Sequence, residues 1–303
     1  MDAPLPACNG EGPAVLRVRA PDGAEAELAI TRPAAAGVGV LWLPALGVSA
    51  RNYQPWARAL AEAGVASALH EWRGTGSSNR RASRRHDWGY RELLEFDIPA
   101  SLAAARQACP GLRWIVAGHS IGGQFAGMFA AINPHAVDAV AFIASGSPYW
   151  RTFPARQRPL LRLLPPVVRS IVALAGYYPG KRIGFAGTEA RTLMREWARS
   201  SQGYYSSYIQ GIDTEASMAS FAGPLLCVRM SEDRLCPHES AEWLLGKFPQ
   251  ATISRAGLEP VDFRTGTASH FSWLREPAPV AQRMKDWIQH GFGPTVTPGT
   301  SRH

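Results

Sequence analysis

Apolar runs that fit buried strands alternate with helical patterns along most of the chain. The runs at 37–43, 65–70, 114–117, 136–144 and 224–230 are continuous enough for strands covered on both faces of a sheet. Between them, apolar residues recur at helical spacing, and Gly or Pro follows. The helices are expected at 53–63, 93–109, 239–247 and 280–288, and after residue 120 up to 132. This alternation predicts an α/β fold with a mostly parallel, doubly wound sheet and helices on both faces.

Weaker patterns flank this alternation. Residues 14–31 alternate in part around Pro21-Asp22-Gly23, which predicts an opening hairpin. A short strand is expected at 251–255, before a loop that contains His270. The final stretch, 291–303, is rich in Gly, Pro and Thr and is expected to be a disordered tail.

The strand–helix alternation stops between residues 148 and 211. This segment is rich in proline and aromatic residues and contains no convincing strand pattern. Amphipathic helices fit 160–175 and 188–200, and the sheet pattern resumes at 224. We therefore expect a core formed by 1–147 and 212–303, with 148–211 as an inserted helical cap.

The net positive charge of the protein is confined to the same segment. The formal net charge is +8, and residues 147–210 contain ten Lys or Arg and two Glu, so the whole surplus lies there. Such a cap could select anionic substrates or contact an acidic lipid surface peripherally. A solvated outer face over an apolar interior is the favoured interpretation. No nucleic-acid-binding motif accompanies the charge, so no nucleic-acid partner is expected.

Length and cysteine content narrow the class of protein further. The 303 residues suffice for one large domain or a core with an insertion, and no apolar run reaches the ~18–20 residues of a membrane span. The first twelve residues lack the pattern of a signal peptide. The four cysteines, Cys8, Cys109, Cys227 and Cys236, form no metal-ligand cluster and are interpreted as reduced thiols. These features predict a cytoplasmic protein without a metal.

The strongest local motif lies at residues 113–124. The strand pattern at Trp114 to Ala117 leads directly into Gly118-His119-Ser120-Ile121-Gly122, and a helical pattern follows. In a turn this tight, glycines two residues before and two after the serine remove the Cβ atoms that would collide. The serine hydroxyl is then lifted clear of the backbone at the N-terminus of a helix, where developing negative charge is favoured. Ser120 is therefore predicted to be a nucleophile.

A serine nucleophile needs a base and an acid that orients the base. Asp233 comes directly after the strand pattern at 224–230, and His270 follows the last expected strand. In a sheet of this kind the partners follow the serine in the order acid, histidine, so Asp233 and His270 are the predicted acid and base. Each could instead be an ordinary loop residue, and their joint placement argues against that.

Other candidates for acid and base fit less well. Glu259 and Asp262 are the fallback acids because both lie on the loop that leads to His270, and Asp213 is less favoured. The side chain of His119 would diverge from the serine next to it. The remaining histidines do not lie where the base is expected; they are His70, His86, His135, His238 and His290.

Two backbone N–H groups are expected to stabilise the oxyanion of the reaction. One should come from Ile121, the residue after the nucleophile. The other should come from the loop Pro44-Ala45-Leu46-Gly47-Val48, in which Leu46 is favoured and Ala45 is the alternative. This loop could also be a plain tight turn.

Together these motifs resemble the α/β-hydrolase superfamily. The resemblance rests on 118–122, on Asp233 with Pro237, on His270-Phe271, and on Arg73-Gly74-Thr75-Gly76-Ser77. It covers nearly all of 25–290 except the cap. The chain is most similar to the capped serine-hydrolase branch, with its esterases, monoacylglycerol-lipase-like and serine-aminopeptidase-like proteins, and to a bacterial group of predicted hydrolases without a settled substrate.

Two departures from the pattern of this superfamily concern loops next to the site. Pro44-Ala45 replaces the usual His-Gly of the oxyanion loop, which bears on the shape of the loop and hence on acyl preference. Ser269 replaces the common glycine before the histidine. Neither departure removes a member of the predicted Ser120, Asp233, His270 triad.

The resemblance implies acyl transfer without a metal or an organic cofactor. A small-molecule acyl substrate would be attacked by Ser120, and hydrolysis of a carboxylic ester is the first expectation. The alternatives are an acyltransferase or thioesterase with the same triad, and a catalytically silent binding scaffold. A serine at this position argues against the dehalogenase and epoxide-hydrolase branches, which use an aspartate. The sequence indicates neither the oligomeric state nor a movement of the cap.

Overall fold

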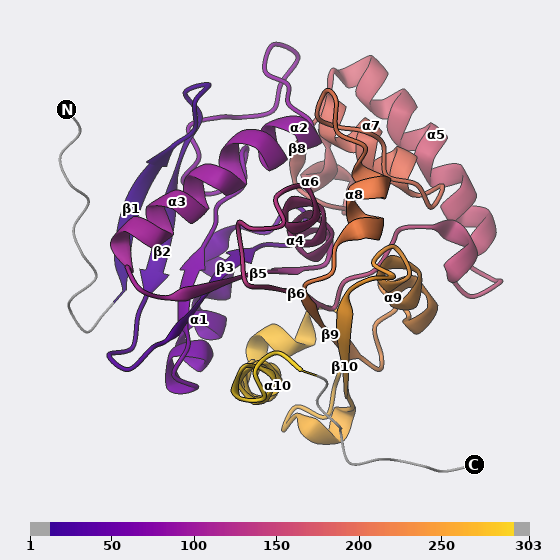
Figure 1. Cartoon of the computed structure of the whole chain (residues 1–303). Helices are drawn as coiled ribbons and strands as arrows, with labels where there is room; N and C mark the ends of the chain where they lie inside the picture. The colour runs from indigo at the N-terminus through magenta and orange to yellow at the C-terminus, as the bar shows by residue number, and fades with distance from the viewer. Residues whose placement is uncertain (1–12, 294–303) are drawn as a thin grey trace.

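A computed structural model describes residues 13–293. Its sheet contains β1 (Ala14–Arg19), β2 (Glu25–Thr31), β3 (Val38–Leu43), β4 (Ala66–Leu69), β5 (Arg113–His119), β6 (Ala139–Ile143), β9 (Pro224–Met230) and β10 (Thr252–Leu258). The strand order is β1-β2-β4-β3-β5-β6-β9-β10 (Figure 1). The hairpin β1–β2 and the pair β2–β4 are antiparallel, and all other pairs are parallel. The predicted mostly parallel sheet and its opening hairpin are confirmed.

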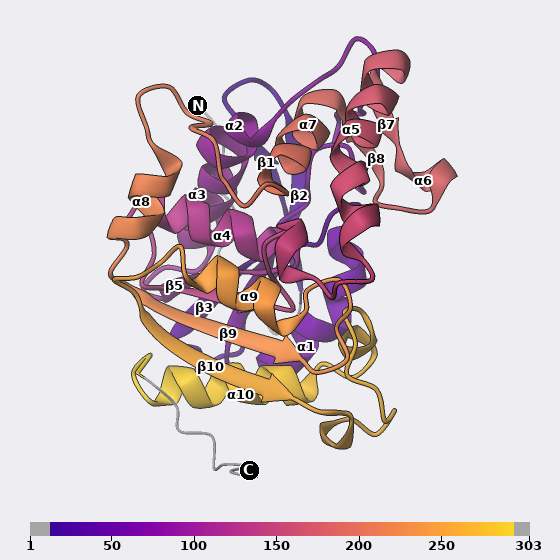
Figure 2. The same cartoon turned by 90° about the vertical axis from the view of Figure 1, so that its right-hand side faces the viewer.

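Helices cover both faces of this sheet. They include α1 (Gln54–Glu62), α3 (Ile98–Ala108), α4 (Ile121–Ile132), α9 (His238–Leu245) and α10 (Ala278–Gln289). α1 and α10 lie on one face, and α3 and α4 lie on the other (Figure 1). Figure 2 shows the same layers at the far edge of the sheet, where α10 lies below β9 and β10 and α9 lies above them.

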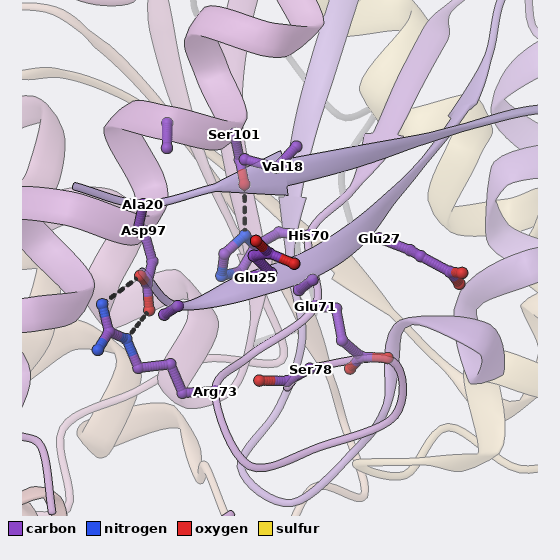
Figure 3. Close-up of a pocket in the computed structure, with 13 residues that line it drawn as sticks. Val18, Ala20, Glu25, Glu27, His70, Glu71, Arg73, Ser78, Asp97 and Ser101 are labelled. Atoms are coloured by element: carbon purple, nitrogen blue, oxygen red, sulfur yellow. Dashed lines mark hydrogen bonds and ion pairs between the residues drawn. The ribbon is translucent and has the colours of Figure 1, made fainter. Parts of the chain in front are cut away.

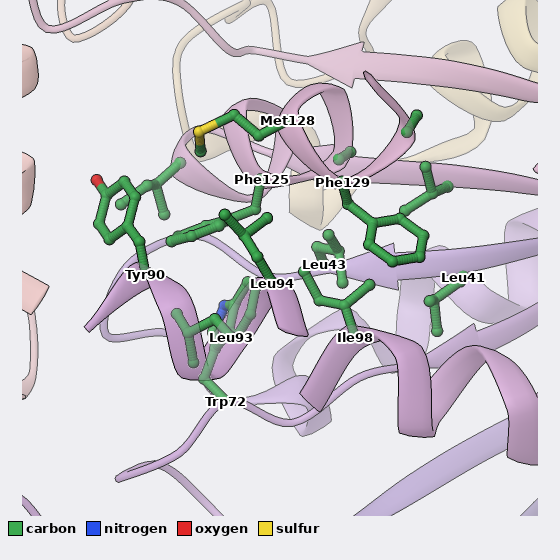
Figure 4. Close-up of a cluster of buried hydrophobic side chains, with 14 of the residues drawn as sticks. Leu41, Leu43, Trp72, Tyr90, Leu93, Leu94, Ile98, Phe125, Met128 and Phe129 are labelled. Carbon is green, nitrogen blue, oxygen red and sulfur yellow. The ribbon is translucent and has the colours of Figure 1, made fainter. Parts of the chain in front are cut away.

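The central strands are apolar throughout because both of their faces are buried. In β3, Val40 and Trp42 point into the core under α1 and α10, whereas Leu41 and Leu43 point toward α4. Figure 4 shows Leu41 and Leu43 beside Phe129 of α4. Truncating an aromatic side chain in such a core costs about 3–5 kcal/mol. The tightly filled core fixes the end of β5, where the site begins.

The helix expected at 93–109 is longer and less regular than the sequence pattern suggested. It starts as α2 (Tyr90–Glu92), widens into a π-helical turn at Leu93–Asp97 and continues as α3. Pro99 lies at the start of α3 and has no N–H to offer to the preceding turn, which accounts for the local widening. The wide turn directs the buried Asp97 toward Arg73.

The 148–211 segment differs in detail from the sequence-based expectation. It contains α5 (Arg158–Ala175), β7 (Tyr177–Pro179), α6 (Gly180–Ile183), β8 (Thr188–Ala190) and α7 (Arg191–Ser200). The expected absence of strands is wrong, because β7 and β8 form a short antiparallel pair. The helix expected at 188–200 therefore begins only at 191. A further helix, α8 (Thr214–Ser220), follows the segment and was not expected.

The C-terminal end of the core also extends further than expected. Phe292 is buried, its ring packs on Trp287 at 5.1 Å between centroids, and the Arg113 guanidinium lies over it. The expected disordered tail is therefore wrong for its first residues, 291–293. The rest of that tail, the first twelve residues and Cys8 lie outside the described residues. Within 13–293, every helix is too short or too polar to cross a lipid bilayer.

Candidate active site

Ser120 occupies a tight turn between β5 and α4. Its backbone angles are φ 57° and ψ −122°, a region that residues other than glycine rarely adopt. The turn needs both flanking glycines: a Cβ on Gly118 would lie 2.2 Å from the carbonyl carbon of Gly122, and a Cβ on Gly122 would lie 2.0 Å from the Leu43 oxygen. The Ser120 N–H donates to the Ile143 oxygen at 3.1 Å, which holds the turn against β6. Strain of this kind is characteristic of functional positions.

His270 and Asp233 form a buried hydrogen-bonded pair beside this turn. His270 Nδ1 lies 2.7 Å from Asp233 Oδ2, and both residues are 5% exposed. The other carboxylate oxygen, Oδ1, accepts the N–H groups of Leu235 and Cys236 at 2.8 Å each. With both oxygens of Asp233 satisfied, the carboxylate is fixed and leaves Nε2 of His270 as the nitrogen available for chemistry.

The loop at 44–49 is held rigidly from three sides. Trp72 Nε1 donates to the Pro44 oxygen at 2.9 Å, and Glu71 accepts hydrogen bonds from the Ser49 hydroxyl and the Ala50 N–H. The Ala45 N–H donates to the Tyr53 hydroxyl at 2.9 Å.

This hydrogen bond occupies Ala45 and leaves the neighbouring amide available. The Leu46 N–H has no partner among the described residues, and Leu46 faces the same cavity as Ile121. Ile121 is the first residue of α4, where an N–H has no partner within the helix. Two residues with available N–H groups therefore line one space beside Ser120.

A cavity of about 400 Å³ opens over Ser120 and His270. Much of its wall is apolar and comes from the 148–211 segment, notably Phe153, Leu161, Leu164, Phe185 and Trp197. Gln124 of α4 forms part of the wall and is fixed there, because its side chain bonds the Gly146 oxygen and the Tyr205 hydroxyl. None of the described residues that line the cavity is Arg, Lys, Asp or Glu.

Cys236 is a part of the site that the sequence did not single out. Its thiol interacts with the Ser120 side chain, and burial raises the pKa of this thiol well above its usual range. Cys236 also forms, with Asp233 and His270, a group whose potential metal-ligating atoms lie within 4.8 Å of one another. Since Asp233 and His270 bond each other and the thiol stays protonated, this group is poorly suited to a cation. The signal in the sequence is the position of Cys236, three residues after Asp233.

A family model described as serine aminopeptidase, S33, matches residues 39–256. The chain belongs to this family of α/β hydrolases. The match spans β3 to β10 and includes Ser120 and Asp233, whereas His270 lies beyond it. Among curated proteins, none matches the sequence.

Solved structures resemble this hydrolase in fold. DcsB, in a structure with a substrate analogue, is 14% identical with a TM-score of 0.65, and the alignment covers 92% of this chain and 99% of that one. GrgF, an α/β hydrolase from Penicillium sp. sh18, is 17% identical with a TM-score of 0.62 and coverages of 92% and 98%. An esterase from Pyrococcus furiosus is 14% identical with a TM-score of 0.59 and coverages of 92% and 91%. The chain therefore has the predicted α/β-hydrolase fold.

The fallback acids of this hydrolase lie elsewhere. Asp262 Oδ2 accepts the Glu259 N–H at 2.8 Å, and its other oxygen faces Arg283. Asp213 caps α8 by accepting the Ala216 N–H at 3.0 Å. These contacts explain the carboxylates as parts of local turns.

Two other histidines, His119 and His70, are buried and hydrogen-bonded within the core. Burial lowers the pKa of His119 well below its usual range, with a smaller effect of His270, and its Nδ1 lies 2.9 Å from the Tyr53 hydroxyl. His70 Nδ1 bonds the Ser101 hydroxyl at 2.8 Å, and burial together with the Arg73 charge lowers its pKa to about 3. Both rings therefore stay neutral.

His70 lines a small cavity on another side of the sheet, shown in Figure 3. Its volume of about 20 Å³ admits little more than one water molecule. At its edge Arg73 donates to Asp97 at 2.6 and 2.7 Å and to Asp22 at 2.6 Å. This ion cluster links the β1–β2 turn to the helix before α3. It thereby fixes the loop whose Glu71 and Trp72 support residues 44–49.

Proposed function

We propose that this hydrolase cleaves carboxylic esters through an acyl-enzyme on Ser120. His270 Nε2 takes the hydroxyl proton as Ser120 Oγ attacks the ester carbonyl, and Asp233 holds the imidazole in the tautomer that makes this possible. His270 then gives the proton to the leaving alcohol. Water releases the acyl group by the same steps, and no metal or cofactor takes part.

One observation carries this proposal. Ser120 in its strained turn, His270 bonded to the buried Asp233, and the residues Leu46 and Ile121 with their available N–H groups all meet at one cavity, which His270, Leu46 and Ile121 line together with Ser120. Leu46 and Ile121 would donate these N–H groups to the oxyanion of the tetrahedral intermediate. Because Ala45 already donates to Tyr53, Leu46 is the better candidate of the two. Oγ of Ser120 would turn from Cys236 toward His270 when substrate binds, as catalytic hydrogen bonds tighten in the reacting complex.

The lining of the cavity favours an uncharged acyl group over a peptide N-terminus. An aminopeptidase has to neutralise the α-ammonium group of its substrate, and the cavity is lined by no Asp or Glu among the described residues. Apolar and aromatic side chains instead suit a hydrocarbon chain. The substrate would therefore be a small ester with an apolar acyl group.

We also propose that residues 148–211 are a cap on a core formed by 1–147 and 212–303. Five large apolar side chains of this segment form the wall of the cavity opposite Ser120. The cap would thus select the acyl group by its aromatic and aliphatic residues, whereas its arginines lie outside the cavity.

The decisive test is labelling with a fluorophosphonate, followed by mapping of the adduct. We expect one adduct on Ser120, none in Ser120→Ala, and normal labelling of the control Ser220→Ala, whose serine is exposed on α8. Ser120→Ala should also lower kcat on p-nitrophenyl esters by about 10³-fold or more. The absence of an adduct on Ser120 in the wild-type enzyme would contradict the proposal.

A substrate panel distinguishes the ester hydrolase from its relatives. In the first assay, p-nitrophenyl esters of graded chain length form the acyl-enzyme, and water and added alcohols compete to release the acyl group. In the second assay, cleavage of aminoacyl naphthylamides measures aminopeptidase activity. We expect the free acid as the main product and no cleavage of the naphthylamides. A dominant alcohol ester would show an acyltransferase, and faster cleavage of the naphthylamides would show an aminopeptidase.

A further inference from the structure

Helix α5 carries an apolar stripe that faces solvent. Leu160, Leu163, Val167 and Leu174 are 73%, 61%, 50% and 79% exposed. Their spacings of three, four and seven residues place them on one side of the helix. Apolar patches of this kind on a soluble protein mark a surface that contacts another apolar phase.

This stripe is distinct from the side of α5 that packs on the protein. Val168 and Val172 are buried with Leu193 and Met194 of α7, so α5 already has one apolar side covered. Figure 1 shows α5 along the outer edge of the molecule with α7 on its inner side, and Figure 2 shows α5 between α7 and the protruding α6. The exposed stripe is therefore a second apolar side, which the fold of the chain does not need.

A basic groove borders the stripe. It has a volume of about 470 Å³ and lies between α5 and α7, where Arg169, Arg195 and Arg199 line it together with Ser170. Among the described residues, no hydrogen bond or ion pair engages the guanidinium groups of Arg169, Arg195 and Arg199, although Arg199 lies close enough to Glu196 to lower the pKa of that carboxyl slightly, against the larger effect of burial. Ser170 lies three residues after Val167 and four before Leu174, so the groove and the stripe are neighbours on one helix.

The other edge of α5 belongs to the catalytic cavity. Leu161 and Leu164, one residue after Leu160 and Leu163, line the cavity above Ser120. Helix α5 thus carries an exposed apolar stripe, one side of the arginine groove and part of the wall of the candidate active site.

We infer that α5 docks the enzyme on an anionic phospholipid bilayer. The stripe enters the boundary between headgroups and acyl chains, as the apolar side of an interfacial helix does. The arginine groove takes phosphate headgroups, and the positive surplus of residues 147–210 gives the docking face the charge complementary to anionic lipid. In this orientation the wall formed by Leu161 and Leu164 lies next to the bilayer, from which an apolar acyl group reaches Ser120.

The test is flotation of the full-length chain with vesicles. The Ser120→Ala background is used throughout, so that binding is measured without turnover and independently of the proposed esterase activity. Vesicles of equimolar phosphatidylcholine and phosphatidylglycerol are compared with phosphatidylcholine alone. We expect binding to the anionic vesicles that weakens with added salt.

Paired variants separate the two parts of the surface. Leu163→Gln/Val167→Gln and Arg169→Gln/Arg195→Gln should each lower partitioning onto anionic vesicles by about tenfold or more. The controls are Val15→Gln/Val261→Gln, at valines that are 58% and 89% exposed, and Arg58→Gln/Arg275→Gln on other exposed sites. The controls should bind like the parent, and all variants should keep its circular dichroism and Tm because only exposed side chains change.

Three results would overturn the inference. One is the absence of binding to anionic vesicles. A second is that the arginine pair lowers binding to vesicles and to duplex DNA alike while the stripe pair binds normally, which would show a general polyanion surface. The third is a concentration-dependent dimer that the stripe pair abolishes while vesicles fail to bind, which would assign the stripe to a second copy of the chain.

Discussion

Glycines at crowded positions determine the backbone around Ser120, because any other residue would bring a Cβ atom into contact with neighbouring backbone. Gly118 and Gly122 allow the turn, since a Cβ on Gly118 would lie 2.2 Å from Gly122 across the turn and a Cβ on Gly122 would lie 2.0 Å from the Leu43 oxygen at the end of β3. Gly47 has the same role in the facing loop: its φ is 72°, and a Cβ would lie 2.2 Å from the nitrogen of Gly187. Loop 44–49 is thus in direct backbone contact with the 148–211 segment, next to the Leu46 N–H that we assign to the oxyanion.

Gly47→Ala should therefore impair catalysis more than binding. The added methyl group has to displace either residue 187 or the loop, and a displaced Leu46 N–H loses its alignment with the oxyanion. We expect kcat to fall by about 10²-fold or more, the usual cost of losing one such donor, while KM changes little. Steady-state kinetics on a p-nitrophenyl ester measures both.

The matched control for Gly47→Ala is Gly64→Ala. Gly64 also has a positive φ, 81°, but a Cβ there meets nothing within 4 Å. This variant should lose about 1 kcal/mol of stability from backbone strain and keep its kcat. An equal loss of kcat in both variants would show that general destabilisation, and not the position of the loop, lowers the rate.

The choice between Asp233 and the fallback acid Asp262 can be decided by isosteric substitutions. Asp233→Asn should lower kcat by about 10³–10⁴-fold, because an amide at 2.7 Å from Nδ1 favours the wrong imidazole tautomer. Asp262→Asn removes only a turn contact and a long ion pair, so kcat should stay within about twofold. A larger loss of kcat in Asp262→Asn than in Asp233→Asn would reverse the assignment.

At the scale of elements, the sequence predicted correctly those strands and helices that have a strong hydrophobic period. The buried strands β3, β5 and β6 stood out as apolar runs, and α1 and α10 stood out by their spacing of apolar residues. β7 and β8 have three residues each and depend on pairing with one another, so no local sequence pattern predicts them. α8 is rich in Ser and Thr and is fixed by its Asp213 cap, a feature that hydrophobic periodicity does not detect.

The candidate site was predictable to the extent that chain order determines it. The strand–turn–helix context indicated Ser120, and the ends of two late strands indicated Asp233 and His270; their roles stay predictions. Contacts between distant segments could not be foreseen. The bond from Ala45 to Tyr53 and the approach of Cys236 to Ser120 depend on how loops from different strands converge at one edge of the sheet.

A buried carboxyl on β8 supports the contact between the 148–211 segment and loop 44–49, and it should make stability depend on pH. Glu189 is 3% exposed, and its Oε1 accepts the N–H of Gly187, the residue in contact with Gly47. Burial raises the pKa of Glu189 from its ordinary 4.5 to about 7, against the smaller opposing effects of that hydrogen bond and of Lys181. Between these values the folded state binds a proton that the unfolded state has lost, so stability falls as pH rises through this window.

Glu189→Gln should remove this pH dependence and keep the hydrogen bond from Gly187. The variant should match the wild type below about pH 4.5 and exceed its stability by about 3 kcal/mol above about pH 7. Urea unfolding across this range measures the difference, with the exposed Glu239→Gln as the control for loss of a surface carboxylate. A wild-type advantage at pH 8 would mean that Glu189 is ionised and stabilising there.

At the scale of the whole molecule, charge and substrate cavity are separated. The positive surplus lies on residues 147–210, yet the cavity that these residues help to form is lined by no charged Arg or Lys among the described residues. Arg151 and Arg162 stack on Trp150, and Arg169 and Arg195 line the outer groove. The positive charge is therefore placed to act on a surface that the protein binds, such as an anionic bilayer, and not on the acyl group inside the cavity.

This separation predicts that cap arginines leave selectivity among soluble esters unchanged. The triple variant Arg156→Gln, Arg158→Gln, Arg162→Gln should keep the ratio of kcat/KM for an anionic ester to that for a neutral ester of equal length within about twofold at physiological salt. The three arginines are exposed and do not line the cavity, and salt screens exposed charges. Steady-state kinetics on the two esters measures this ratio, and a double variant of the cavity wall, Leu161→Ala/Leu164→Ala, provides the contrast. That variant should raise KM for long acyl chains by about tenfold or more and spare short ones, since it removes apolar contact from the cavity. A selective loss of activity on the anionic ester in the arginine variant would instead place these charges at the entrance used by the substrate.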